Sequence, residues 1–329
     1  MNQIQQVYVT GGAGYVGSML VPCLLKAGYN VTVLDLMIYG DALLPDDPNL
    51  TAIKGDIRDV ELLSTTLAGH DAVIHLACIS NDPSFELNPK LGRSINLDAF
   101  RPLVEISRQS GVQRFIYASS SSVYGVKNAP SVCEDMTLEP LTDYSRFKAD
   151  CEKVLAEFQS ASFTTVTVRP ATVCGYSARQ RLDVVVNILT NRAYHLREIT
   201  VFGGSQLRPN IHIADMVDAY LTILQASTEN VAGEIFNVGY ANQSVSELGQ
   251  AVKEVLGPDV RVIATPTDDK RSYHISSDKI QKQLEFKASH SIREAIEDLV
   301  RAFDDGLLPN SLEDERYFNI KRMQSLDLK

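Results

Sequence analysis

Short apolar, β-branched runs alternate with stretches of helical spacing over the first half of the chain. The runs predict strands near Val7–Val9, Val31–Leu34, Ala52–Lys54, Ala72–His75, Phe115–Ala118 and Thr165–Val168. The stretches between them predict helices over Tyr15–Lys26, Val60–Leu67, Leu91–Gln109 and Tyr144–Phe158. Strands that alternate with helices indicate parallel pairing through helical crossovers, and nearly continuous apolar runs indicate strands buried on both faces. The pattern therefore predicts the α/β class, with a doubly wound parallel sheet.

The alternation ends after Pro170. Polar, arginine-containing loops then separate shorter elements, among them predicted helices over Ala214–Gln225, Val245–Leu256 and Ser291–Phe303. We interpret residues 1–170 as one domain and residues 171–329 as mainly a smaller C-terminal α/β lobe. Because no Gly-, Ser- or Pro-rich linker separates them, we expect the lobes to pack closely and the chain to cross back to the first domain.

Composition narrows the range of partners. The chain has 329 residues and a formal net charge of -10, which disfavours the phosphates of a nucleic acid as a partner. The five cysteines are an odd number without CxxC spacing, which argues against a disulfide framework or a metal site. No signal-peptide pattern is visible, and no apolar stretch approaches the roughly 20 residues of a membrane helix. We therefore expect a cytoplasmic protein without a membrane partner.

A glycine-rich turn directly follows the first predicted strand and opens the first predicted helix. Gly11, Gly14 and Gly17 stand there in GxxGxxG spacing. Glycine lets the backbone approach a dinucleotide pyrophosphate, whose charge meets the free N–H groups of the helix N-terminus. Asp35 ends the second strand, where a carboxylate accepts both ribose hydroxyls and repels a 2′-phosphate, and no Arg or Lys closely follows it. Residues 1–170 are thus predicted to form a Rossmann domain that binds NAD rather than NADP.

A YxxxK pair, Tyr144 and Lys148, follows the helix-start signal Thr142-Asp143. Residues four apart share one face of a helix, so the phenol and the ammonium can converge. A nearby ammonium stabilises a tyrosinate and lowers its pKa, which would make Tyr144 a usable base near neutral pH.

These motifs, with the serine-rich strand end Ser119–Gly125, resemble the extended short-chain dehydrogenase/reductase superfamily and its NAD-dependent nucleotide-sugar epimerases and dehydratases. The resemblance implies that Ser120 is the third catalytic group and hydrogen-bonds the reacting sugar oxygen. Ser119 and Ser121 are the competing assignments. It also implies that Tyr144 takes the proton of a sugar hydroxyl while a hydride passes to the nicotinamide.

The resemblance implies further cofactor contacts. Besides the three glycines, Asp35 and the YxxxK pair, the implied cofactor residues are Tyr15, Val16, Asp56, Ile57, Leu76, Ala77, Asn96, Pro170 and Val173. Asn96 corresponds to an asparagine that braces the central helix and the active-site backbone. Lys148 is expected to hold the nicotinamide ribose as well. We interpret His75 as a core histidine and His212 as structural.

A nucleotide-diphosphate sugar is the substrate that the resemblance implies. The implied substrate residues besides Ser120 are Arg181, Asn187, Arg208 and Arg271. A guanidinium suits this role because it donates two parallel hydrogen bonds to phosphate oxygens.

Three functions stay open. The family's 4,6-dehydratases carry Thr-Asp-Glu where this chain has Ser120-Ser121-Ser122, so loss of water lacks its acid and base here. A 4-epimerase passes through a transient 4-keto sugar that the bound cofactor re-reduces, and this is the interpretation we favour. The alternative is a 4-dehydrogenase or ketoreductase that releases its product, for example on a GDP-heptose. A non-catalytic NAD-binding sensor is the remaining hypothesis.

The family resemblance also implies a homodimer built from two helices of each subunit, here Leu91–Gln109 and Tyr144–Phe158. The tail Glu313–Lys329 carries no motif with an assignable role.

Overall fold

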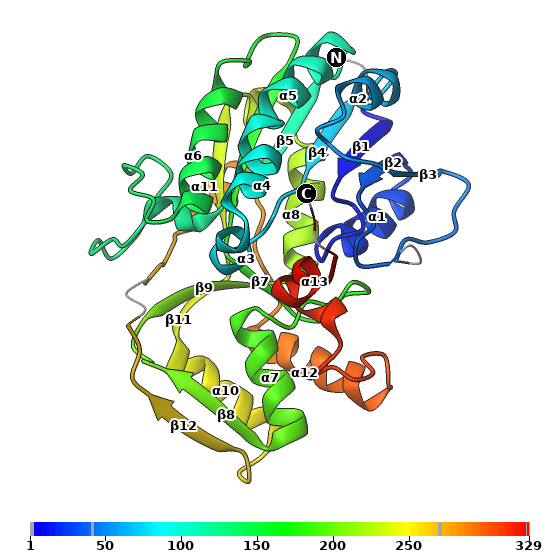
Figure 1. Ribbon diagram of the computed structural model, residues 1–329. Coiled ribbons are helices and arrows are strands. Elements are labelled where there is room, and N and C mark those ends of the chain that lie inside the picture. The colour runs from blue at the N-terminus through cyan, green and yellow to red at the C-terminus, as the bar shows by residue number, and fades with distance from the viewer. Residues whose placement is uncertain (1–2, 41–42, 269–271, 327, 329) are drawn as a thin grey trace.

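A computed structural model describes residues 3–40, 43–268, 272–326 and 328 of the protein. Its upper part in Figure 1 is a seven-stranded sheet in the order β10-β6-β5-β4-β1-β2-β3, in which every pair of neighbours is parallel. The strands are β1 (Gln6–Thr10), β2 (Asn30–Asp35), β3 (Leu50–Lys54), β4 (Ala72–His75), β5 (Arg114–Ala118), β6 (Thr164–Pro170) and β10 (Glu234–Val238). The predicted doubly wound α/β fold is confirmed, and the six strands predicted before residue 170 all lie in this sheet.

Helices cover both faces of the large sheet because side chains alternate along each strand. Val7 and Val9 of β1 pack on one face with helices α1 (Gly17–Lys26) and α8 (Ile213–Gln225). Tyr8, between them, packs on the other face with α2 (Val60–Thr66), α5 (Phe100–Gln109) and α6 (Asp143–Ala156). The core is therefore two apolar layers divided by the sheet.

The predicted helix Leu91–Gln109 is three segments in the structure. These are α4 (Pro89–Arg93), the π-helical turn η1 (Ser94–Asp98) and α5, and the short α3 (Asp82–Leu87) precedes them. The wider π turn carries Asn96 inward, where its side-chain oxygen accepts from the Ile79 amide at 2.8 Å and its nitrogen donates to the Ile79 carbonyl at 2.9 Å. The interruption of the helix thus braces the loop after β4.

The smaller lobe lies below the sheet in Figure 1. It contains a three-stranded sheet of β7 (Thr172–Cys174), β9 (Leu207–His212) and β11 (Ala241–Ser244), and a parallel pair of β8 (Glu198–Phe202) and β12 (Arg261–Thr265). Helices α7 (Val185–Leu196), α10 (Val245–Leu256) and α12 (Ile292–Asp304) enclose its own apolar core. The short helix α9 (Thr228–Val231) precedes β10 in the chain, and α11 (Asp278–Leu284) packs against β10.

Residues beyond Pro170 return to the first domain in several places. Strand β10 pairs with β6 in the large sheet, and α8 packs against α1. The C-terminal segment, with the 3-10 turn η3 (Glu315–Tyr317) and helix α13 (Asn319–Leu326), lies at the junction of the lobes (Figure 1). No helix in the described part of the chain is both long and apolar enough to cross a membrane.

Candidate active site

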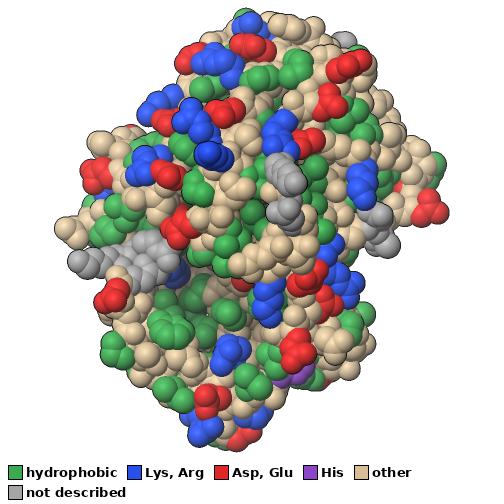
Figure 2. Space-filling model, in the orientation of Figure 1, with side chains coloured by type: hydrophobic (Ala, Val, Ile, Leu, Met, Phe, Trp, Pro, Cys, Tyr) green, Lys and Arg blue, Asp and Glu red, His purple; other side chains and the backbone are tan. Residues whose placement is uncertain are grey.

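A cleft with a volume of about 520 Å³ opens between the lobes, and Figure 2 shows an apolar hollow on this side of the molecule. It lies beyond the carboxyl ends of the large sheet, where the strand order reverses between β1 and β4. That reversal creates the crevice in which doubly wound sheets bind their ligands. The predicted residues that line it are Gly11, Gly14, Tyr15, Val16, Gly17, Asp35, Asp56, Ile57, Leu76, Ala77, Ser120, Tyr144, Lys148, Pro170, Val173, Arg181 and Arg208.

The glycine turn leaves no room for side chains on its inner side. A Cβ on Gly11, which has φ +75°, would lie 2.6 Å from the Ala77 amide nitrogen, and one on Gly17 would lie 2.5 Å from the Gly11 carbonyl oxygen. Helix α1 starts at Gly17 rather than at Tyr15, and no acidic residue stands in its first turn. Its free N–H groups therefore face the cleft in a cradle that fits the pyrophosphate of a dinucleotide.

Asp35 lies at the end of β2, with its carboxylate held in place by two backbone donors. One oxygen accepts from the Ala13 amide at 3.0 Å and the other from the Met37 amide at 2.8 Å. Burial raises the pKa of Asp35, and the two hydrogen bonds oppose that shift. The carboxylate keeps acceptor capacity toward the cleft, which suits the two hydroxyls of a ribose.

Ser120, Tyr144 and Lys148 meet at the end of the cleft below β5. The capping box of Thr142 and Ser145 begins α6, so Tyr144 and Lys148 lie on successive turns of one face. The Ser120 hydroxyl, which bonds the Ser122 hydroxyl at 2.8 Å, lies close enough to Tyr144 to lower its pKa, and the Lys148 Nζ lies 5.9 Å from the centre of the Tyr144 ring. Lys148 Nζ also donates to the Ala118 carbonyl at 2.6 Å.

Burial raises the pKa of Tyr144 well above its ordinary value, and the neighbouring Cys78 and Asp82 act in the same direction. The charge of Arg181 and the hydrogen bond of Ser120 lower the pKa but do not outweigh burial. The protein groups alone therefore keep Tyr144 protonated. A nearby positive charge, such as that of an oxidised nicotinamide, is the influence that would oppose the effect of burial.

Ser119, directly before Ser120, contacts a buried ionic network. Ser119 donates a short hydrogen bond to Glu152, which lies one turn after Lys148 on α6. Glu152 pairs with Arg169 of β6 at 2.6 Å, with both side chains at least 95% buried, and Arg169 donates to the Tyr124 hydroxyl at 2.7 Å. This network ties α6 to the ends of β5 and β6. All three candidate serines line the cleft, and the Ser120 hydroxyl is the one that lowers the pKa of Tyr144.

His75 and His212 both have protein partners. The His75 ring bonds the Thr10 hydroxyl at 2.7 Å beneath the cleft, and burial, aided by the Lys148 charge, lowers its pKa to about 3. His212 bonds Asp298 at 3.0 Å and accepts from the first turn of α8. These contacts are those of structural residues.

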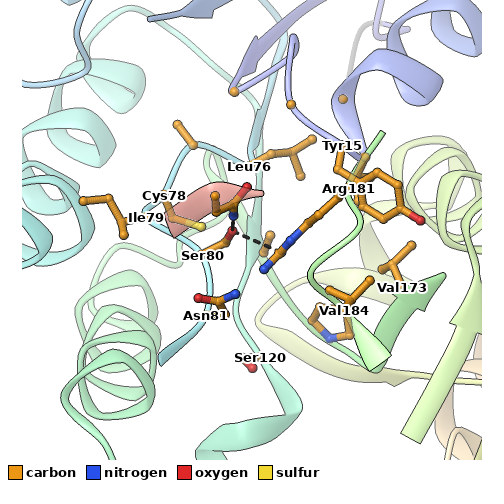
Figure 3. Close-up of a pocket in the computed structure, with 18 of the residues that line it drawn as sticks. Tyr15, Leu76, Cys78, Ile79, Ser80, Asn81, Ser120, Val173, Arg181 and Val184 are labelled. Carbon is orange, nitrogen blue, oxygen red and sulfur yellow. Dashed lines mark hydrogen bonds between the residues drawn. The ribbon is translucent and has the colours of Figure 1, made fainter. Parts of the chain in front are cut away.

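Arg181 extends across the cleft between the two lobes (Figure 3). Its Nε pairs with Asp183 at 2.5 Å and its Nη1 donates to Ser80 at 3.2 Å. Arg208 lies on β9 with its guanidinium carbon 5.7 Å from the centre of the Tyr273 ring. Arg271 lies outside the described residues.

Asn96 and Asn187 are not among the residues that line the cleft. The buried Asn187 amide donates to the Tyr15 hydroxyl at 3.0 Å and to the Arg181 carbonyl at 2.8 Å. It therefore supports two lining residues from behind, as Asn96 supports the loop after β4.

Among the lining residues that were not singled out from the sequence are Tyr39, Ser80, Arg179 and Asn319. Arg179 stands two residues before Arg181 in the same arginine-containing loop, which was the only available signal. The others lie in loops or in the tail, where no motif marks them.

A doubly wound sheet with a glycine cradle at its crevice and a YxxxK helix beside it defines an NAD-dependent enzyme of the extended short-chain dehydrogenase/reductase type. The chain belongs to the NAD-dependent epimerase/dehydratase family, whose model matches residues 7–239, more than half of its length.

Individual relatives agree with that assignment. The UDP-glucose 4-epimerase of Lactobacillus helveticus is 28% identical over 316 residues, covering 90% of this chain and 94% of that protein. The structure of the Thermotoga maritima UDP-glucose 4-epimerase with UDP-glucose superposes with a TM-score of 0.82 at 27% identity, covering 92% of this chain and 100% of that one. The Thermus thermophilus UDP-glucose 4-epimerase in complex with NAD gives a TM-score of 0.81 at 26% identity, covering 91% of this chain and 99% of that one.

Proposed function

We propose that the protein is a nucleotide-sugar 4-epimerase, with residues 1–170 providing most of the NAD site and the smaller lobe providing most of the substrate site. The observation that carries this proposal is that Ser120, Tyr144 and Lys148 line the end of one cleft that continues to the glycine cradle. Relatives named UDP-glucose 4-epimerase support the same reaction.

The protein's own residues perform the proton transfers of the proposed reaction. Tyr144, as phenolate, removes the proton of the C4 hydroxyl, and Ser120 donates a hydrogen bond to the C4 oxygen as it becomes a carbonyl. NAD supplies a hydride acceptor, and in its reduced form a donor, at the nicotinamide. The 4-keto sugar would then rotate, and Tyr144 would return the proton to the C4 oxygen when the ketone is reduced on its opposite face. No atom or electron is gained or lost, so the product is an isomer.

The carboxylates of the cleft support epimerisation over dehydration. Of the described lining residues, the acidic ones are Asp35, Asp56, Asp82 and Asp183. Asp183 is paired with Arg181, Asp82 accepts from Thr142 at 2.5 Å, and Asp35 and Asp56 lie on the cofactor side. Removal of water across C5–C6 needs an acid and a base beside Ser120, where this chain has Ser121 and Ser122.

The test is incubation of the enzyme with excess NAD and a panel of UDP-, dTDP- and GDP-sugars. We expect the sugar to be converted to its C4 epimer while absorbance near 340 nm stays flat. Absorbance that rises well beyond one equivalent per enzyme would show release of an oxidised sugar, and the dehydrogenase interpretation would replace the epimerase. Conversion of no sugar by the NAD-loaded protein would favour the sensor.

We also propose that the protein is a cytoplasmic homodimer in which α5 and α6 of each subunit pack together. These helices lie side by side on one face of the molecule (Figure 1). Sedimentation of the native protein at twice the chain mass would support the dimer, and sedimentation at the chain mass would contradict it.

A further inference from the structure

Arg179 belongs by sequence to the smaller lobe but lies against the cofactor side of the cleft. Arg179 lies in the loop that follows β7. The Ser177 hydroxyl of this loop hydrogen-bonds the Ser18 hydroxyl at the start of α1, with the two oxygens 2.8 Å apart. The Arg179 amide donates to the Ser18 hydroxyl at 3.1 Å. The loop thus carries the arginine to the glycine cradle and Asp35.

The Arg179 side chain is buried without a full set of partners. The residue is 4% exposed, its guanidinium carbon stacks 3.4 Å from the centre of the Tyr39 ring, and its Nη2 donates to Asn319 Oδ1 at 2.6 Å. Within the described part of the structure its Nε has no hydrogen-bond partner, and the carboxylates that act on its charge, Asp183 and Asp35, form no ion pair with it. A buried, unpaired guanidinium is costly unless an anion compensates it.

The surroundings indicate which anion belongs there. Arg179 lines the cleft together with the start of α1, where a dinucleotide places its pyrophosphate. A 2′-phosphate is disfavoured because the Asp35 carboxylate stands beside the same site. The substrate diphosphate is expected farther away, at Arg208 on β9.

Asn319, at the start of α13, fixes the position of this arginine. Its Oδ1 accepts from Arg179 and, at 2.9 Å, from the Tyr39 hydroxyl, while its Nδ2 donates to Ser80 at 2.9 Å. Its amide donates to Asp183 at 2.9 Å. One 4%-exposed side chain in the tail therefore joins the loops after β2, β4 and β7 around the cleft.

We propose that Arg179 binds the diphosphate of NAD and that Asn319 is the positioning residue that holds it there. The cofactor would then be gripped by the helix N-terminus from one lobe and by an arginine from the other. This proposal needs only the NAD dependence of the family, so it stands or falls independently of epimerisation.

The test is equilibrium binding to the full-length, NAD-stripped protein, with NAD, ADP and adenosine as probes. For Arg179→Met we expect affinity for NAD and for ADP to fall roughly 10- to 100-fold, as for loss of a charge-assisted hydrogen bond, and affinity for adenosine to be unchanged. Arg316→Met is the matched control. Arg316 lies in the same C-terminal segment as Asn319, but it is exposed and pairs with Asp314. Equal weakening of adenosine and ADP, or unchanged affinity for ADP, would overturn the proposal.

Asn319→Ala tests the positioning role, also where Arg179→Met does not fold. We expect a smaller loss for NAD and ADP, none for adenosine, and no additional loss in the double variant, because the asparagine acts through the arginine. Fully additive losses would show that Asn319 does not act through Arg179.

Discussion

The two walls of the cleft are built differently. The wall formed by the sheet places its groups at strand ends and on α6, where backbone hydrogen bonds and the Glu152–Arg169 pair fix them. The wall formed by the smaller lobe and the tail is built largely of loops and carries Arg179 and Arg181 in one loop and Arg208 on β9. In the reaction that we propose, the sheet wall supplies proton transfer, which needs precise geometry, and the loop wall supplies positive charge for phosphates. Substitutions in the two walls should therefore change different measured quantities.

Of the changes to the sheet wall, Tyr144→Phe should cause the largest loss of activity. Removal of the proton-transferring hydroxyl is expected to lower kcat by about 10²- to 10⁴-fold. The Kd for NAD should stay within about two-fold, because the ring and Lys148 remain. A matched control is Tyr240→Phe, since Tyr240 is exposed. Retained turnover in Tyr144→Phe would remove the tyrosine from the mechanism.

Glu152→Gln should destabilise the sheet wall by removing the buried ion pair of Glu152 with Arg169. It leaves the Arg169 guanidinium buried without its counter-charge, so we expect the free energy of unfolding to fall by about 3–5 kcal/mol. Glu157→Gln, at the end of the same helix, removes an exposed pair with Arg101 and should cost less than about 1 kcal/mol. Denaturant unfolding measures both, and equal losses would contradict the structural role of the buried pair.

Arg208→Met should weaken substrate binding without changing turnover, which would separate the role of the loop wall from that of the sheet wall. We expect the KM for the nucleotide sugar to rise roughly 10- to 100-fold, with kcat and the Kd for NAD little changed, because a phosphate contact is lost. Arg179→Met should show the reverse pattern, with weak NAD binding. If both variants weakened the same ligand, the division of the arginines between cofactor and substrate would be wrong.

Substitution of His75, which lies beneath the sheet wall, should have the smallest effect, a change in how the free energy of unfolding depends on pH. The folded protein keeps His75 neutral down to its pKa of about 3, whereas a histidine in the unfolded chain takes up a proton below about pH 6.5. The unfolded chain thus binds more protons between these values, and its stabilisation lowers the free energy of unfolding as the pH falls, by up to about 1.4 kcal/mol per pH unit. His75→Gln should show a shallower loss between pH 6 and pH 5 in denaturant titrations. An unchanged slope would contradict the neutral assignment.

The sheet wall was largely predictable from the sequence, because each of its groups follows from a strong local pattern. Gly11 and Gly17 mark a turn that tolerates no Cβ, Asp35 closes an apolar run, and the YxxxK spacing matches one helix face. The roles of these residues, and of Ser120, remain predictions that the variants above test. The position of Ser120 against Tyr144, rather than that of Ser119, became visible only through the Glu152 contact.

The loop wall was less predictable, since its contacts join residues far apart in the chain. Arg181 was selected from the arginine-containing loop, but nothing local shows that Arg179 turns toward Tyr39 or that Asn319 meets both. The interruption of the predicted helix at Ser94–Asp98 was missed for a similar reason. Its cause is the fit of Asn96 against Ile79, which is a tertiary contact.

The pairing of β10 with β6 has a consequence for any attempt to divide the protein. Strand β6 is buried along nearly its whole length and lies between β5 and β10. Its neighbour β10 (Glu234–Val238) enters the sheet from far beyond Pro170. A fragment that stops at Pro170 would therefore expose a long, β-branched, unpaired edge, which is a template for intermolecular pairing. We expect such a fragment to aggregate, so the nucleotide-binding half cannot serve as a portable module.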